Sequence, residues 1–101
     1  MTAPISSAPE VHDFAAQGFP LIGGRLDYLN NREVAALVYR RNKHFVNVFV
    51  WPTAERGNGQ LAMKERRGYS LIDLEARGLH YCLVSDLNTA ELAQLAKLIE
   101  Q

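Results

Sequence analysis

The 101-residue sequence has one cysteine, Cys82, no surplus of either charge and no long apolar run. A single cysteine excludes an internal disulfide and any zinc site built from cysteines. Lys plus Arg and Asp plus Glu each number 11, so the basic surplus with which dedicated nucleic-acid binders recruit phosphate is missing. No apolar stretch approaches the roughly 18 residues of a membrane span. The first ten residues, MTAPISSAPE, lack the basic start and apolar stretch of a secretion signal, so none is predicted.

The remaining composition is that of a globular protein, with 48% apolar and 22% charged residues. A chain of this length forms one domain around a single core. Residues 1–18 are rich in Ala, Ser and Pro and predict an arm or linker. Residues 19–101 then form the folded domain.

Runs of β-branched and aromatic residues predict five strands, at 19–29, 32–41, 44–51, 68–76 and 79–86. Residue pairs suited to two-residue turns separate several of them, namely Asn30-Asn31, Asn42-Lys43 and Arg77-Gly78. Gly23-Gly24 within the first strand predicts a bulge or a close backbone approach. The polar stretch 53–67, with two glycines, predicts a mobile loop.

The C-terminal segment carries the signals of a helix that begins after Asn88. Asn88 can cap the first turn, and Glu91 can reach back to the Asn88 amide to complete a capping box. Leu87 and Leu92 occupy the positions of a hydrophobic staple. An apolar stripe follows at helical spacing, formed by Leu92, Leu95, Ala96 and Ile99.

A two-residue turn at Asn42-Lys43 fixes which strand residues share a side of the sheet, because side chains alternate along a strand. One side is apolar, and the stripe of the helix can cover it. Its predicted members are Ala35, Leu37, Tyr39, Val46, Val48, Val50, Ile72, Leu74, Tyr81 and Leu83, with Ile22 and Leu26 from the first strand. The predicted fold is therefore α+β: an antiparallel meander sheet of about five strands with one C-terminal helix packed on one face.

The opposite side of the predicted sheet is too apolar for bare water and too polar for a simple core. Its predicted members are Arg25, Asp27, Val34, Ala36, Val38, Phe45, Asn47, Phe49 and Trp51. One helix cannot cover both sides, so the N-terminal arm, a second copy of the chain, a partner, or a small ligand would lie there. Arg25, Asp27, Asn47, Phe49 and Trp51 are the candidate interaction residues.

A second candidate site is a basic tip where the second strand turns into the third. Arg40, Arg41, Lys43 and His44 cluster there, and charges at a hairpin tip also discourage edge-to-edge pairing. The tip is interpreted as a solvated turn, with contact to an anionic lipid surface as the alternative. Stacking aromatics of a nucleic-acid platform are represented only by Phe45 nearby, so no direct nucleic-acid binding is expected.

No arrangement of residues predicts catalysis or a cofactor. His12, His44 and His80 lack metal-ligand spacing, which argues against a metal site. Cys82 would need a base beside it to act as a nucleophile, and His80 is the one candidate two residues away. The simpler interpretation is a small buried thiol. We therefore expect a non-enzyme without cofactors.

Two long segments carry a family resemblance: GFPLIGGRLDYLNNREVAALVYRRNKHFVNVFVWP (18–52) and RGYSLIDLEARGLHYCLVSDLNTAELAQLAKLI (67–99). They contain a Gly-Gly-Arg-Leu-Asp-Tyr strand, a Val-Tyr-Arg-Arg hairpin, a Phe-Val-Trp-Pro end and a Val-Ser-Asp-Leu-Asn helix entrance. Together they resemble the C-terminal, extracytoplasmic domain of bacterial transmembrane anti-sigma factors.

The resemblance implies a two-compartment transcription regulator. In such proteins a cytoplasmic domain, often zinc-binding, sequesters a sigma factor, one membrane helix follows, and the outer periplasmic domain acts as a sensor. The sequence has neither a zinc motif nor a membrane helix, so a sigma factor would be bound only through a missing cytoplasmic domain. The expected function is a sensory or protein-interaction domain near the membrane surface. The alternative is a stand-alone small-ligand or protein-binding module that forms a homodimer.

Overall fold

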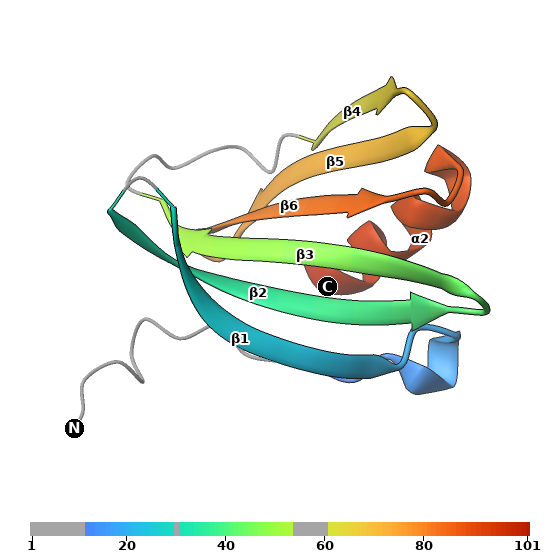
Figure 1. Ribbon diagram of the computed structural model, residues 1–101, viewed down its shortest axis with the longest axis horizontal. Helices are drawn as coiled ribbons and strands as arrows, with labels where there is room; N and C mark the ends of the chain where they lie inside the picture. Colours follow the sequence, from blue (N-terminus) through green and yellow to red (C-terminus); the bar gives the residue numbers. More distant parts are fainter. Residues whose placement is uncertain (1–11, 30, 54–60) are drawn as a thin grey trace.

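The computed structural model describes residues 12–29, 31–53 and 61–101, which form one antiparallel sheet and one C-terminal helix (Figure 1). The elements follow the chain in the order η1 (Ala15–Gln17), β1 (Leu21–Leu29), β2 (Arg32–Arg41), β3 (His44–Pro52), β4 (Leu61–Arg66), β5 (Tyr69–Ala76), β6 (Leu79–Ser85) and α2 (Thr89–Glu100). The α+β class predicted from the sequence is confirmed.

Two details of the predicted sheet are wrong. The sheet has six strands in the order β1-β2-β3-β6-β5-β4, so it consists of two three-stranded meanders joined side by side through β3 and β6. The strand missed by the sequence analysis is β4, which falls in the predicted loop 53–67; the part of that loop at 54–60 lies outside the described residues. Ala, Lys and Glu are weak strand formers, and an exposed edge strand has no apolar alternation to reveal it.

The turns and registers follow the prediction closely. Arg41 pairs with His44 and Ala35 with Val50 across β2 and β3. In the last hairpin Ile72 pairs with Leu83, across a turn at Arg77-Gly78 where both residues have positive φ. In β1 the pairing shifts between Leu21 and Gly23, which confirms the bulge expected near Gly23-Gly24.

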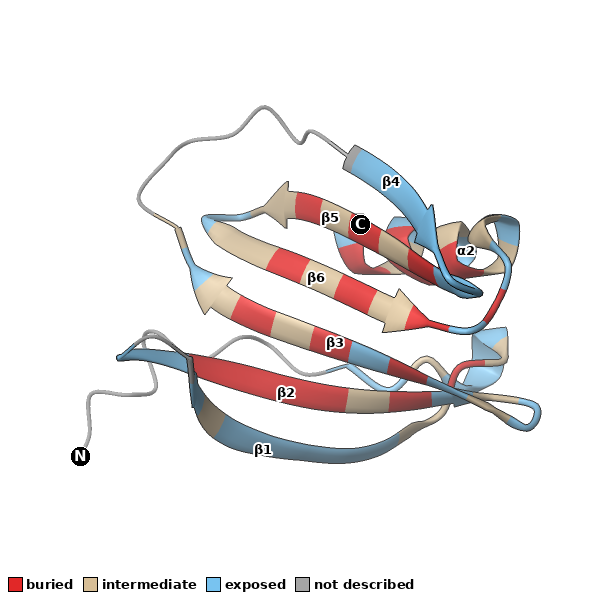
Figure 2. Ribbon diagram, turned by 45° about the horizontal axis from the view of Figure 1, so that its top comes forward, coloured by how far each residue is buried: buried red, intermediate tan, exposed pale blue. Residues whose placement is uncertain are grey.

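The helix face of the sheet is the side on which α2 packs, and it holds the main core. Buried and less buried residues alternate along β3, β5 and β6 (Figure 2). The four residues of the predicted helix stripe are buried in this core, and α2 lies against β5 and β6. The other half of the same face, over β2 and β3, is covered by the N-terminal segment 12–20. Phe19 is fully buried in the core, and the ring of Phe14 stacks on Tyr39 at 5.9 Å.

The first strand departs from the predicted core. Ile22 and Leu26 were expected on the covered side, but they are 50% and 65% exposed. Leu26 shares the side of Ala35, yet β1 is the edge of the sheet and α2 packs at the opposite half. Ile22 lies at the bulge, where the alternation of side chains is interrupted.

The start of α2 is capped as predicted, with one difference. Asn88 Oδ1 accepts a hydrogen bond from the Glu91 amide at 2.8 Å, and Leu87 and Leu92 are both buried. The carboxylate of Glu91 does not bind the Asn88 backbone amide. Its Oε1 accepts from the Asn88 side-chain Nδ2 at 3.3 Å instead, and its Oε2 faces Arg41. The carboxylate is drawn away from the capping-box position because Arg41 offers it a charged partner.

Candidate interaction face

The aromatic face is the side of the sheet opposite α2. The register assigns to it the nine residues predicted from the sequence, and β5 and β6 add Leu71, Asp73, Glu75, His80, Cys82 and Val84. The described part of the N-terminal arm, 12–20, packs on the helix face and covers none of the aromatic face; residues 1–11 lie outside the described residues. Among described residues, therefore, no helix or arm lies over this surface.

Large side chains on the aromatic face are partly exposed, and small side chains between them are buried. Phe45 is 54% exposed, and Phe49 and Trp51 are half-buried. Ala36 is only 3% exposed, because Arg25 on β1 and Phe49 on β3 pair with it from either side. The surface available to a partner therefore combines aromatic side chains with the exposed polar residues Arg25 and Asn47.

Trp51 is held in place by a stack on His80. The two ring centroids lie 4.6 Å apart with an interplanar angle of 18°. The imidazole lies between two carboxylates: Nε2 is hydrogen-bonded to Asp73 Oδ1 at 3.0 Å, and Nδ1 lies 3.6 Å from Glu75 Oε2. The hydrogen bond to Asp73 orients this ring, the His80 platform on which the indole stacks.

Cys82 lies next to this platform and is not activated as a nucleophile. Burial raises the pKa of its thiol to about 12, and the negative charge of Asp73 and a hydrogen bond with that carboxylate add to the effect. A reactive cysteine needs a lowered pKa. The predicted buried thiol is thus only half-buried, and its raised pKa does not suit a nucleophile.

Two of the predicted interaction residues lie at the border of the aromatic face. Arg25 Nη2 and Asp27 Oδ2 form an exposed ion pair at 3.6 Å on β1. Asn47 is exposed in the middle of β3, opposite Val38 and Val84. The five predicted residues thus share one side of the sheet, with Phe49 and Trp51 near the His80 platform and the charged pair at the edge.

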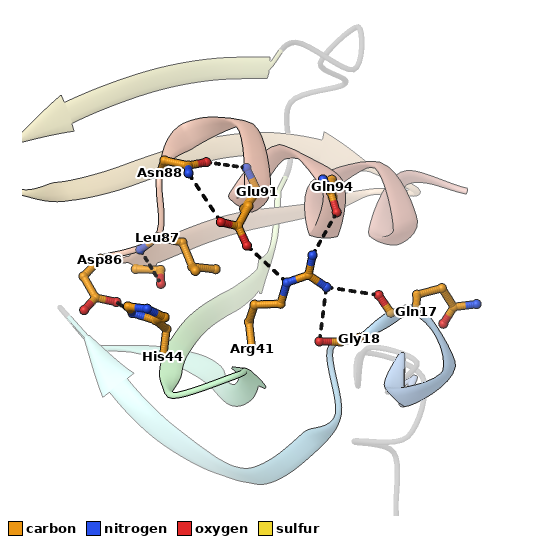
Figure 3. A network of polar contacts seen from close by, with 10 residues as sticks. Gln17, Gly18, Arg41, His44, Asp86, Leu87, Asn88, Glu91 and Gln94 are labelled. Atoms are coloured by element: carbon orange, nitrogen blue, oxygen red, sulfur yellow. Dashed lines mark hydrogen bonds and ion pairs between the residues drawn. The ribbon is translucent and has the colours of Figure 1, made fainter.

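Two residues of the predicted basic tip, Arg41 and His44, contact carboxylates at or just before the start of α2 (Figure 3). Arg41 points back into the molecule: its Nε lies 3.2 Å from Glu91 Oε2, and its guanidinium carbon is 4.6 Å from the centre of the Phe19 ring. The same guanidinium donates to the carbonyls of Gln17 and Gly18 at 3.4 and 3.5 Å. Arg41 therefore joins the β2–β3 hairpin to both the helix and the N-terminal segment.

The other residues of the tip, Arg40, Lys43 and His44, lie at the surface or close to it. His44 Nδ1 lies 3.0 Å from Asp86 Oδ1, and Arg40 Nε donates to the Asn42 carbonyl at 2.8 Å. Glu91 faces Arg41 and Asp86 faces His44, so Arg40 and Lys43 are the residues of the tip that offer positive charge to an anionic surface. A solvated hairpin tip describes this arrangement best.

A small cleft is found on the helix face, between the N-terminal segment and the end of α2. Its lining residues are His12, Phe14, Leu37, Tyr39, Val48, Arg77, Tyr81 and Ile99. Its volume of about 10 Å³ is that of one water molecule. The cleft is too small for an organic ligand.

Neither a metal centre nor a membrane helix is found in the part of the chain that the structure describes. In those residues, no three His, Cys, Asp or Glu side chains gather closely enough to hold a metal ion. None of the described helices is long and apolar enough to cross a membrane. Compared with protein-family models, curated proteins and solved structures, the chain matches none of them. The resemblance to anti-sigma factors therefore stays a prediction.

Sequence reasoning missed Asp73 and Glu75, although a signal for them was present. A two-residue turn at Arg77-Gly78 places Glu75 opposite His80 and Asp73 opposite Cys82. Two acidic residues and a histidine on the same side of one hairpin indicate an ion-pair cluster. The stack of Trp51 on His80 required the pairing of β3 with β6, which the predicted meander does not contain.

Proposed function

We propose that this chain is a non-catalytic interaction domain that binds a protein partner through the aromatic face. The observation that carries the proposal is the stack of Trp51 on His80, whose ring is oriented by a hydrogen bond to Asp73, beside the half-buried Phe49. Aromatic side chains that are already ordered lose little conformational freedom on binding, and Trp is among the commonest residues that dominate binding energy.

The chemistry of the face indicates what the partner presents. Phe45 and Trp51 offer apolar area, while the carboxylates of Asp73 and Glu75 flank the imidazole of His80 on which the indole stacks. A polypeptide segment with apolar side chains and at least one Lys or Arg fits this combination, because a cation can lie on the indole and face the carboxylates.

The resemblance to anti-sigma factors suggests the setting of this binding domain. In that setting it is the periplasmic sensor of a membrane-anchored regulator, and a sigma factor is bound by a separate cytoplasmic domain. A reading frame that joins this domain to a membrane helix and a zinc-binding domain, beside a sigma-factor gene, would support the setting. An independent gene without those segments would instead favour the stand-alone binding module.

Crosslinking in the native cell tests the binding proposal directly. A photoreactive phenylalanine analogue at Phe45 should yield a crosslink to one defined protein, and Trp51→Ala in the same chain should abolish it. The same analogue at Lys97, an exposed residue of α2 on the opposite side of the sheet, should not give that product. A product that survives Trp51→Ala, or no product at Phe45 beyond that at Lys97, would contradict the proposal.

A further inference from the structure

β1 is an edge strand with an unusual exposed surface. Among the described strands it pairs only with β2, and Ile22, Leu26 and Tyr28 are 50%, 65% and 68% exposed. The opposite edge, β4, carries three consecutive charged residues at 64–66, which is how edges avoid pairing with other chains. Of the two edges of the described sheet, β4 alone is thus protected by a run of charges.

The register shows which backbone groups of β1 face outward. Leu29 and Arg32 face each other across a two-residue turn, so they form a hydrogen-bonded pair. By alternation the odd-numbered residues from 23 to 27 direct their amides and carbonyls towards β2. The residues between and after them, Gly24, Leu26 and Tyr28, direct theirs outward.

Two hydrogen bonds agree with this assignment. The Arg40 amide donates across to the Pro20 carbonyl at 2.9 Å, so the even-numbered residues of β2 face β1. The Tyr28 amide donates to the side chain of Asp27 at 3.0 Å, as expected for an amide without a β2 partner. The outward groups of β1 are therefore available to another strand.

The side chains of β1 are complementary to a second copy of the same strand. If two β1 strands pair in antiparallel fashion about a two-fold axis at Leu26, Arg25 lies opposite the second copy's Asp27, and Asp27 opposite its Arg25. Leu26 then meets its own counterpart, and Tyr28 lies over the second copy's Gly24, an aromatic-on-glycine pairing that shields an edge glycine. An axis at Arg25 or at Asp27 would instead place like charges face to face, and an axis at Gly24 would leave Arg25 opposite Gly23.

The two-fold axis at Leu26 also satisfies the backbone. Leu26 faces Leu26, and Gly24 faces Tyr28, so each paired residue is one whose amide and carbonyl point outward. The Tyr28 amide would exchange its bond with Asp27 for a bond to the second copy, which releases Asp27 to face the other chain's Arg25. Backbone, charges and apolar side chains thus select the same register.

We infer that two copies of this chain associate through β1, in the register centred on Leu26, and join their two sheets into one continuous sheet. The contact is isologous, so it closes as a dimer and does not propagate into a fibre. It uses the β1 edge, including Arg25 and Asp27 at the border of the aromatic face, and does not involve Phe49 or Trp51, so it does not rest on the proposed function.

Charge reversal with exchange of partners tests the register. The side chains of Arg25 and Asp27 are 63% and 47% exposed, so Arg25→Asp and Asp27→Arg should leave each protomer folded, as thermal melts would check. Sedimentation velocity of the wild type over a range up to millimolar concentration should show a dimer. Each single variant should raise the dimer Kd about tenfold or more, because both symmetric pairs become like-charged.

An equimolar mixture of the two single variants should restore association. The Arg25→Asp chain then presents two carboxylates, at positions 25 and 27, and the Asp27→Arg chain presents two guanidinium groups opposite them. The double reversal in one chain should restore the homodimer. Lys64→Glu on β4 is the matched control and should not change the Kd.

Four outcomes would overturn the inference. The first is a wild type that stays monomeric at millimolar concentration. The second and third are single variants that leave the Kd unchanged and a mixture that fails to restore association. The fourth is a dimer that is lost in Trp51→Ser but kept in both β1 variants, because this result would assign the contact to the aromatic face.

Discussion

Replacing Arg41 by Ala should destabilise the fold far more than its position at a hairpin tip suggests. Its side chain is only 22% exposed, and its ion pair with Glu91 at 3.2 Å is partly shielded from water. A charge-assisted hydrogen bond of this kind contributes about 1.5–3 kcal/mol, and the contact with the Phe19 ring about 0.5–1 kcal/mol. The bonds to the Gln17 and Gly18 carbonyls are long and add little.

Together these contacts predict a loss of about 3 kcal/mol in the free energy of unfolding for Arg41→Ala. For a domain of this size the midpoint of thermal unfolding should fall by roughly 12 °C or more. Urea denaturation followed by circular dichroism would measure the change. Arg41→Lys keeps the charge but loses the planar fork, so about half of the loss should remain.

Arg40→Ala is the matched control, because the neighbouring side chain is exposed and its Nε bonds to the Asn42 carbonyl, with no ion pair to a described residue. It should change stability by no more than about 0.5 kcal/mol. A double-mutant cycle of Arg41→Ala with Glu91→Gln should give a coupling of about 1 kcal/mol or more. If Arg41→Ala costs no more than Arg40→Ala, or if the cycle shows no coupling, Arg41 is a surface residue and the reasoning is refuted.

Single sites elsewhere in the chain give three more expected outcomes. Asn88→Ala removes the cap of α2 and should cost about 1 kcal/mol in urea denaturation; an unchanged midpoint would contradict the cap. Gly18→Ala should lower the free energy of unfolding more than Gly68→Ala. Both glycines have positive φ (91° and 83°), but only at Gly18 does the guanidinium of Arg41 lie where a Cβ would be. Equal losses of stability would show that the guanidinium moves away freely. The pKa of Cys82 rises from 9.0 to about 12 and that of Tyr39 from 10.0 to about 12, both chiefly through burial, so the folded chain holds these protons longer than the unfolded chain. The stability that these two groups contribute is fully present below pH 9 and is lost as the pH rises towards 12. The free energy of unfolding should fall by at most about 1.4 kcal/mol per pH unit for each group. A free energy of unfolding that stays constant over this range would contradict the pKa shifts.

The sequence predicted the local parts of the fold well because local chemistry determines them. An Asn-Lys pair between two alternating strands fixes the register of β2 and β3, and Asn88 followed by Glu91 fixes the start of α2. Both patterns act within a few residues. The alternation in β3 then determines that Phe49 and Trp51 share the side opposite the helix.

The parts that sequence reasoning missed depend on contacts between distant segments. Nothing local to Arg41 shows that Glu91, 50 residues later, will accept its charge, so the residue looked like one more base at the tip. The arm on the helix face was missed because Phe14 stands in a stretch of Ala, Ser and Pro that predicts a linker, and Phe19 was assigned to the first strand. The position of β4 at the edge was hidden since its side chains are exposed.

The division of the helix face between α2 and the N-terminal segment has a consequence for anyone who shortens the chain. Phe19 is a core residue supplied from outside the strands, and the Tyr39 hydroxyl donates to the His12 carbonyl at 3.0 Å. A fragment cut at the start of β1 would expose Leu37 and Val48, which the missing piece had sheltered from water. The shortest fragment that keeps this core therefore begins at or before residue 12. A peptide of residues 12–20 added in trans should restore the stability of a fragment cut at the start of β1.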